Sequence, residues 1–389
     1  MDITKRIKIG ILFNYGKNWM GGVIYIINLV KSLDKLPDSE KPEIIIFYDD
    51  NSKPFVNEIA YPYLIFIYRK TPNQYFNYLF SALKRKNCFE GGIIDKYQLD
   101  GLFPLNDFPF NLGKNNFKAA AWYPDLQHKF YPQYFSRSKY FFREWRIKLI
   151  LKNASHIVLS SNDVYGHFKK FYNLNSHLNI HILRFTSIID GFSFPSFEQL
   201  RIKYDIKEDY FIVSNQFYQH KNHLTVFKAL KLLKDENINC KVLFTGTMED
   251  KNNPGFIKGL KRTLINLDIQ NYVRFVGLIH RAEQLCLMKN SLAVIQPSLF
   301  EGWSTVIEDA KALKCPIIAS NLEVHKEQLT NCNNGFLFEA QDASNLSNLM
   351  KTFIKNEIRI IPTDEDYNKL TIDFARNFIK IFSNEIVNN

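Results

Sequence analysis

Residues 292–320, LAVIQPSLFEGWSTVIEDAKALKCPIIAS, decide the fold of this 389-residue chain. An apolar run of strand length, LAVIQPS, ends in a turn that holds Glu301 and Gly302, and Ser304 and Thr305 then open a segment of helical spacing. A second strand-like run, PIIAS, follows this segment. The order strand, helix, strand predicts neighbouring parallel strands in a sheet that helices cover.

The same alternation extends along the rest of the chain. Strand-like runs such as IKIGILF, EIIIFY, HIVLSS, DYFIVSN and KVLFTG are interleaved with helical patterns, and around residues 184–200 Gly, Pro and lost periodicity indicate a linker. We therefore predict an α/β fold of two Rossmann-like domains whose parallel sheets face each other across a cleft. The expected parts are domain 1–190, domain 191–365 and a C-terminal helical segment, 366–389, that is free to cross back to the first domain.

The positive charge is unevenly distributed. The net charge is +11, and residues 1–190 hold 26 Lys and Arg against 16 Asp and Glu, whereas residues 191–389 hold 24 against 23. The basic half calls for an anionic partner: a nucleic acid, an acidic lipid surface or a phosphorylated substrate. Five scattered cysteines and apolar runs far shorter than a membrane helix indicate a cytoplasmic protein, soluble or peripheral.

The helix start after Gly302 is a candidate anion site. Free N–H groups and the positive dipole end of a helix favour an anion, and phosphate is the natural occupant. A plain capping arrangement of Ser or Thr followed by acids fits the same residues. The chain has no GxGxxG after its first strand and no GxxxxGK[ST], GxSxG or HExxH, which argues against NAD-dependent enzymes, P-loop NTPases and hydrolases.

The block from Pro297 to Leu329 resembles the C-terminal signature of glycosyltransferase family 4, the group 1 glycosyltransferases, which are retaining enzymes of the GT-B fold. The shared order is Pro-Ser, an aromatic, Glu-Gly-aromatic, a helix with a second acid, then Pro and two apolar residues before Ala-Ser-Asn. The resemblance implies that Glu301 contacts the donor sugar and that a carboxylate on the helix binds the ribose. Asp309 stands in the family's register and Glu308 one residue earlier, so the ribose ligand is open between them. The donor-binding residues implied beside them are Gly302, Trp303, Ser304 and Thr305.

A second stretch, IVSNQFYQHKNHLTVFKAL at 212–230, resembles the family's diphosphate-binding segment. Lys221 fits the family's Lys, but Gln216 stands where the family has Arg, so one cation is missing unless His220 or another cation substitutes. Further on, VRFVGLIHRAEQL resembles the family's strand and loop at which backbone atoms meet the nucleobase. The candidates in that loop are Gly277, Leu278 and Ile279, unless Gly277 only closes a strand turn.

The first half carries three weaker matches. Gly21 and Gly22 resemble the family's Gly-rich loop near the donor phosphates and acceptor, although glycine is also the usual residue of turns. His128, in WYPDLQHKFYPQYFS, resembles the His that the family presents to the donor sugar, and a structural His is the alternative. Asp125 would either orient the His128 ring or cap the next helix.

The helix-like stretch 129–152 holds seven Lys and Arg and one acid, Glu144, with aromatics between them. Such a helix either lies in an anionic lipid interface or packs on a core with a solvated basic face. The charge suits a saccharide acceptor on a polyprenyl diphosphate at the inner face of the plasma membrane.

The resemblance implies an EC 2.4 hexosyltransferase that uses a nucleotide-sugar donor and no metal or other cofactor. We expect it to extend a glycan or lipid-linked saccharide in lipopolysaccharide, O-antigen or related surface-polysaccharide biosynthesis. Glu301, Lys221 and His128 are the catalytic candidates. Two alternatives remain: an inactive GT-B scaffold subunit, which the Gln216 substitution supports, and a basic nucleic-acid-binding α/β protein, of which no recognised module is visible.

Overall fold

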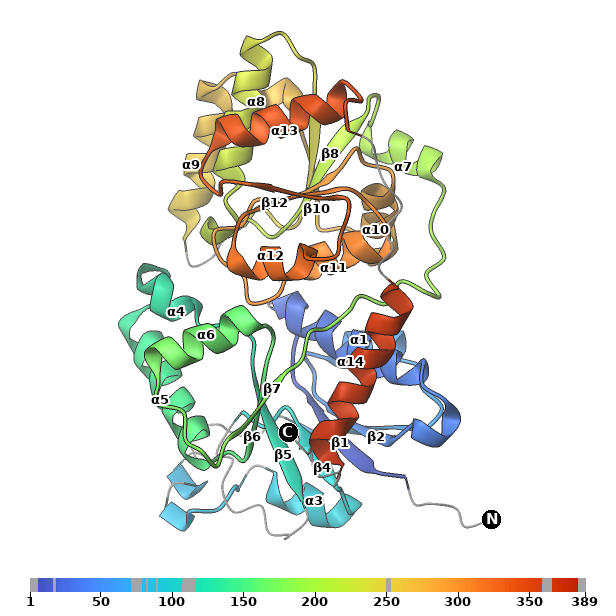
Figure 1. Cartoon of the computed structure of the whole chain (residues 1–389), viewed down its shortest axis with the longest axis vertical. Coiled ribbons are helices and arrows are strands. Elements are labelled where there is room, and N and C mark those ends of the chain that lie inside the picture. Colours follow the sequence, from blue (N-terminus) through green and yellow to red (C-terminus); the bar gives the residue numbers. More distant parts are fainter. Residues whose placement is uncertain are drawn as a thin grey trace. The chain divides into compact units, whose positions relative to one another are not determined.

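The computed structural model describes residues 6–16, 19–70, 79–81, 83–88, 90–106, 117–249, 253–358 and 366–383. The chain divides into two compact units (Figure 1). Unit 1 comprises Met1–Ile188 and Asn368–Asn389, and unit 2 comprises Ile189–Tyr367.

Unit 1 is built on a seven-stranded sheet in the order β3-β2-β1-β4-β5-β6-β7, with every neighbouring pair parallel. Its strands read as nearly continuous apolar runs because helices cover the sheet. The strands are β1 (Lys8–Phe13), β2 (Glu43–Tyr48), β3 (Leu64–Tyr68), β4 (Gly101–Phe103), β5 (Lys118–Tyr123), β6 (His156–Leu159) and β7 (Asn179–Ile182). The α-helices with given bounds are α1 (Met20–Asp34), α3 (Gly91–Tyr97), α4 (Gln127–Phe130), α5 (Arg137–Asn153), α6 (Asn162–Phe171) and α14 (Tyr367–Phe382).

Unit 2 is built on a six-stranded parallel sheet in the order β10-β9-β8-β11-β12-β13. One apolar core joins the sheet to α8, α9 and α13, and a second joins its other face to α7, α10, α11 and α12 (Figure 1). The strands are β8 (Tyr210–Ser214), β9 (Lys241–Thr245), β10 (Val273–Gly277), β11 (Val294–Gln296), β12 (Ile317–Ser320) and β13 (Gly335–Phe338). The helices are α7 (Phe197–Tyr204), α8 (His223–Asp235), α9 (Pro254–Asn266), α10 (Arg281–Lys289), α11 (Thr305–Ala312), α12 (Glu323–Leu329) and α13 (Ala343–Ile354).

The parallel sheets and the alternation of strands and helices confirm the predicted α/β class. Two local expectations need correction. The single helix expected from residue 129 is divided, because Pro132 ends α4 and Ser136 caps the separate helix α5. The stretch 184–200, expected as a linker, already contains the start of α7. The C-terminal helix, expected to be free to cross back to the first domain, spans Tyr367–Phe382 and packs in unit 1, where Phe378 meets Phe103.

Candidate functional site

The candidate site of unit 2 lies where β8 and β11 end. These strands are neighbours in the sheet although they are not consecutive in the chain, and the connections on their two sides run in opposite directions. Ligands of doubly wound sheets bind at this switch point, at the carboxyl ends of the strands. Here Asn215, directly after β8, donates from Nδ2 to Oε1 of Gln296 at the end of β11, at 2.8 Å.

Glu301 carries a carboxylate that accepts three hydrogen bonds at this position. Its Oε1 accepts hydrogen bonds from Lys221 Nζ at 2.5 Å, Ser298 Oγ at 2.6 Å and Gln296 Nε2 at 2.8 Å. Burial raises the pKa of this carboxyl, but the charges of Lys221 and His220 outweigh burial, and the net pKa lies below the ordinary value. The side chain is therefore an anion whose Oε1 is held in one orientation.

Lys221 reaches this carboxylate because a short turn precedes α8. Lys221 ends the 3-10 helix η5 (Gln219–Lys221), and Asn222 follows in the left-handed conformation, with φ 55°. Asn222 Nδ2 donates to the carbonyls of Pro297 at 3.0 Å and Ala340 at 2.6 Å. The Asn222 amide thus links the Lys221 turn to the segments after β11 and β13. These two hydrogen bonds explain why an asparagine follows the lysine at this position.

Gln216, at the position where the family has Arg, holds the neighbouring loop. Its Oε1 accepts from the backbone N–H of Thr247 at 2.9 Å. The loop passes so close that a Cβ at Gly246, where φ is +103°, would lie 2.3 Å from the carbonyl oxygen of Asn215. Gln216 therefore contributes a neutral amide that positions the turn after β9.

The first turn of α11 is held by a glutamine of α12. Gln328 Oε1 accepts from Ser304 N at 2.9 Å, and its Nε2 donates to Ser304 O at 3.1 Å. Ser304 Oγ in turn caps the helix by accepting from Ile307 N at 3.4 Å. The Ser304 N–H is thus already paired, so any anion at this helix would use the following N–H groups, beginning with Thr305. Gly302 is buried here and Trp303 half-buried.

The two adjacent acids of α11 point to different neighbours. Asp309 is buried and accepts two bonds from Arg281, one of them from Nη1 to Oδ2 at 2.7 Å. Glu308 is equally buried, but it accepts from Gln328 Nε2 at 3.0 Å and from the Tyr367 hydroxyl at 2.9 Å. Adjacent helical residues differ by about 100° around the axis. This rotation directs Asp309 toward α10 and Glu308 toward α12.

Arg281, which sequence reasoning missed, begins α10 directly after the expected nucleobase loop. Gly277 has φ +73°, and its carbonyl accepts from Gly246 N at 2.8 Å, while Leu278 is exposed and Ile279 half-buried. Arg281 thus follows the 277–279 loop closely in the chain, and its guanidinium binds the Asp309 carboxylate. Further along α10, the side-chain amide of Gln284 donates from Nε2 to Ser214 Oγ at 2.5 Å.

His325 is a further buried group beside Glu301 that the sequence did not reveal. Its Nδ1–H donates to the carbonyl of Ser320 at 2.8 Å, and Ser320 Oγ donates to the carbonyl of Ser298 at 2.6 Å. Burial lowers the pKa of His325 to about 4. A neutral imidazole thus supports the segment that carries Ser298.

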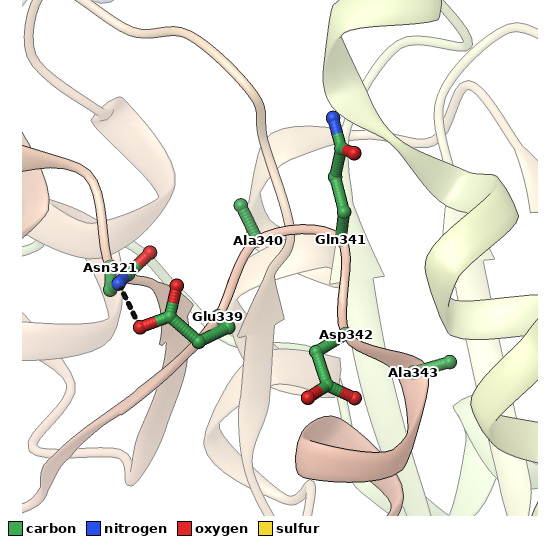
Figure 2. A pocket seen from close by; sticks show the side chains of 6 residues that line it. All are labelled: Asn321, Glu339, Ala340, Gln341, Asp342 and Ala343. Atoms are coloured by element: carbon green, nitrogen blue, oxygen red, sulfur yellow. Dashed lines mark hydrogen bonds between the residues drawn. The ribbon is translucent and has the colours of Figure 1, made fainter.

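A shallow hollow of about 630 Å³ lies at the carboxyl ends of β12 and β13 (Figure 2). Figure 2 shows the Glu339 side chain turned toward Asn321, to which it is hydrogen-bonded, whereas Gln341 points away from that pair. The lining carries two carboxylates and no cation, so it suits hydroxyl groups better than phosphate. Its residues are Asn321, Glu339, Ala340, Gln341, Asp342 and Ala343.

His128, the expected sugar contact, lies in unit 1 with its side chain fully buried. Its Nε2 is 2.7 Å from Glu144 Oε1, and burial lowers the pKa of the imidazole. Glu144 also accepts from Lys129 and from the Tyr172 hydroxyl, each at 2.6 Å. Asp125 precedes Leu126, the N-cap of α4, and its Oδ1 accepts from Gln127 N at 2.9 Å. In this structure the His128 side chain is buried and bound to Glu144, and its contact with a sugar stays a prediction.

Gly21 and Gly22 do not form the loop expected of them. Both lie in the first turn of α1, directly after Trp19. A Cβ at Gly22 would lie 2.6 Å from Cε3 of the Trp19 ring, so the glycine is required by that contact.

In the part of the chain that the structure describes, no cluster of three or more His, Cys, Asp or Glu side chains is placed to hold a metal ion. Within the same residues, no helix is both long enough and apolar enough to cross a lipid bilayer.

Comparison with known proteins gives matches over both units. Residues 196–372 match the family model described as "Glycosyl transferases group 1". The O-antigen chain mannosyltransferase RfbU of Salmonella typhimurium is 25% identical over 207 residues, which are 53% of this chain and 53% of that protein. The chain therefore aligns with about half the length of this curated relative.

Solved structures match almost the whole chain at low identity. A glycosyltransferase from Rickettsia africae ESF-5 is 20% identical with a TM-score of 0.64, covering 97% of this chain and 94% of that one. Anabaena Alr3699/HepE, solved in complex with UDP and glucose, is 14% identical with a TM-score of 0.70, covering 97% of this chain and 100% of that one. These likenesses establish the GT-B fold of the chain.

Proposed function

We propose that the chain transfers a hexosyl residue from a nucleotide sugar to a saccharide acceptor with retention of the anomeric configuration, as a group 1 glycosyltransferase whose family model matches residues 196–372. The observation that carries the proposal is the contact of Lys221 with Glu301 at the switch point of unit 2. A lysine, a fixed carboxylate and the N-terminus of α11 meet there, and these are groups that recognise a diphosphate joined to a sugar.

Each part of the donor has a matching group in unit 2. The sugar hydroxyls bind the Glu301 carboxylate, which accepts hydrogen bonds. The diphosphate binds Lys221 and the N–H groups of α11 that follow Ser304. Asp309, rather than Glu308, binds the ribose, because the Arg281 that it contacts begins α10 at the end of the 277–279 loop. The nucleobase lies against that loop.

The reaction needs no protein nucleophile. The acceptor hydroxyl oxygen forms a bond to the anomeric carbon while the bond from that carbon to the diphosphate oxygen breaks. The hydroxyl proton passes to the departing diphosphate. Lys221 and the positive end of α11 stabilise the negative charge that develops on the leaving group, and they are already in place before the reaction.

Unit 1 supplies the acceptor side, and α5 gives it a surface for anionic membranes. Spacings of four, four, three and four residues place Arg137, Phe141, Trp145, Lys148 and Lys152 in one stripe along α5. Phe141 is 68% exposed and Trp145 is 42% exposed. The opposite side of the helix packs on the core through Ile147, Ile150 and Leu151. The core packing matches one interpretation of the α5 sequence, and we propose that the aromatic–basic stripe holds the protein on the inner face of the plasma membrane near a polyprenyl-diphosphate-linked acceptor.

The donor is best sought among mannose and glucose nucleotides. RfbU is named a mannosyltransferase of the O-antigen chain, and HepE was solved with UDP and glucose. We favour mannosyl transfer in O-antigen or related surface-polysaccharide assembly, since RfbU is similar in sequence to this chain whereas HepE shares 14% identity with it.

A thermal-shift and turnover screen with GDP-mannose, UDP-glucose and dTDP-glucose tests the proposal. We expect one donor to raise the melting temperature and to release its nucleoside diphosphate in the presence of a membrane extract as acceptor source. Lys221→Ala and Glu301→Gln should abolish both signals, whereas the matched exposed substitutions Lys231→Ala and Glu323→Gln should not. Donor binding without turnover would indicate the scaffold alternative, and the absence of binding by any donor would refute the enzyme proposal.

A further inference from the structure

Trp19 is an exposed aromatic residue at the carboxyl end of the unit 1 sheet. It lies between β1 and α1, its N–H donates to the Gly16 carbonyl at 2.8 Å, and the residue is 40% exposed. β1 borders β4 at the point where the order of strands in unit 1 changes direction. Trp19 therefore occupies the place at which doubly wound sheets present ligand-binding groups.

The indole of Trp19 is the outer layer of an aromatic stack. It stacks on Trp122 of β5, with ring centroids 5.2 Å apart and planes at 21°. Trp122 stacks in turn on Tyr25 of α1 at 4.0 Å and 16°. Tyr15 meets Trp19 edge-on at 4.7 Å. Because Trp122 and Tyr25 are buried, the stack has a fixed base and an open outer ring.

Gly22 lets the indole lie flat against α1. A Cβ at this position would come within 2.6 Å of Cε3 and 2.8 Å of Cζ3 of Trp19, whereas one at Gly21 would make an ordinary contact at 3.5 Å with Nε1. Glycine inside a helix costs about 1 kcal/mol relative to alanine. Glycine at position 22 therefore makes α1 less stable than alanine would, but it leaves room for the Trp19 ring.

Two hydrogen-bond donors within the stack have no partner among the described residues. They are Trp122 Nε1 and the hydroxyl of Tyr25. Such groups are rare in native structures, and each calls for an explanation such as an unseen water or ligand. Beside them, Asn106 Oδ1 accepts from Trp122 N at 2.8 Å. Because both donor atoms are buried, an oxygen-rich ligand on the outer ring would bind them through water.

We propose that Trp19 is the platform on which a pyranose ring of the saccharide acceptor stacks. The proposal rests on the proposed function, which places the acceptor in unit 1. The axial C–H groups of a pyranose form an apolar face that packs on a flat indole, while its hydroxyl groups remain at the rim for polar partners. Stacking on a fixed ring loses little conformational entropy, because the Trp19 orientation is already set by Trp122 and Gly22.

Saturation-transfer NMR on the full chain tests the platform without requiring turnover. The probes are methyl α-D-mannopyranoside and methyl β-D-glucopyranoside, measured with saturating GDP and UDP present so that the donor site of unit 2 is occupied. We expect transfer to the axial ring protons of at least one probe, a loss of at least fivefold in Trp19→Ala and at most a threefold loss in Trp19→Phe. Gly22→Ala should lose the signal as well while keeping its melting temperature, because its methyl group displaces the indole and alanine favours the helix.

The outcomes separate this proposal from the function on which it rests. Equal transfer in the wild type and Trp19→Ala, or transfer to n-octanol but to neither pyranoside, would overturn the platform, the second result indicating a lipid contact. Nucleotide-sugar binding is measured independently by thermal shift and should be unchanged in Trp19→Ala. If that binding is absent in the wild type, the proposed function fails while the platform experiment still gives its own answer.

Discussion

The ammonium nitrogen of Lys221 lies 2.5 Å from Oε1 of Glu301, although 80 residues separate them in the sequence. Both side chains are largely buried, and Gln296 and Ser298 donate to the same oxygen. Removing one member of such a pair leaves an uncompensated buried charge, whereas replacing both removes the problem together with the chemistry. Stability and activity should therefore respond differently at this pair.

Lys221→Ala should lower the free energy of unfolding by about 3 kcal/mol and turnover by at least about 100-fold. The double variant Lys221→Met/Glu301→Gln should regain most of the lost stability but none of the activity, because no cation then faces the leaving diphosphate. Urea unfolding and release of nucleoside diphosphate measure the two quantities. A double variant that is as unstable as Lys221→Ala would show that the pair is not coupled in this way.

Gln328→Ala should loosen the start of α11. The substitution leaves the buried N–H of Ser304 without its partner, whereas the Ser304 carbonyl still accepts from Glu308 N at 3.2 Å, and an unpaired buried group costs about 1–3 kcal/mol. We expect the protein to lose about 2 kcal/mol of stability and the donor to bind about tenfold more weakly, because α11 carries the anion-binding N–H groups. Calorimetric titration with the donor measures the affinity, and Glu327→Ala on the same helix is the control. An unchanged affinity would exclude this helix start from the donor site.

The alternation of strands and helices was predictable because each element carries its own periodicity, and the start of α11 was predictable because Gly302, Ser304 and the following acids are adjacent in the chain. The residues that they contact were not predictable from the sequence. Arg281 and Asp309 lie 28 positions apart, and Gln328 and Ser304 lie 24 positions apart, so only packing brings them together. Whether Glu308 or Asp309 binds the ribose stays a prediction, and the two side chains differ by one step of rotation around α11.

Unit 1 shows why a short motif can mislead. The pattern around His128 was compatible with a ligand contact, but Glu144 of α5 binds that imidazole, and Tyr172, directly after α6, donates to the same carboxylate. The Gly21–Gly22 pair was interpreted as a loop because it resembles the Gly-rich loop of the family. Its actual neighbour is the Trp19 ring, and local composition does not reveal where a large side chain will lie.

Acidic pH should destabilise the protein through His325. Its pKa falls from the ordinary 6.5 to about 4 on folding because the ring is buried. The folded state then binds fewer protons than the unfolded state, so this contribution is absent above pH 6.5 and destabilises progressively as the pH falls toward 4. Between pH 7.5 and pH 5 the wild type should lose about 2 kcal/mol more than His325→Asn, whose amide still donates to Ser320 O.

Urea unfolding at the two pH values, followed by circular dichroism, gives this difference. The exposed His177→Asn is the matched control and should retain the wild-type pH dependence. If His325→Asn and the wild type lose the same stability, protonation of His325 does not contribute.

Membrane attachment should depend on both components of the α5 stripe. We expect the wild type to bind vesicles of phosphatidylglycerol and phosphatidylcholine at 50 mM NaCl and to bind more weakly at 500 mM, because salt screens the basic residues. Lys148→Gln/Lys152→Gln should weaken binding about 30-fold, since each cation near an anionic surface contributes about 1 kcal/mol. Phe141→Ser/Trp145→Ser should weaken it at least tenfold and leave the salt dependence unchanged. Ile202→Ser, at an exposed apolar position of α7 in unit 2, controls for the loss of an apolar side chain, and equal binding by all variants would exclude α5 from the membrane contact.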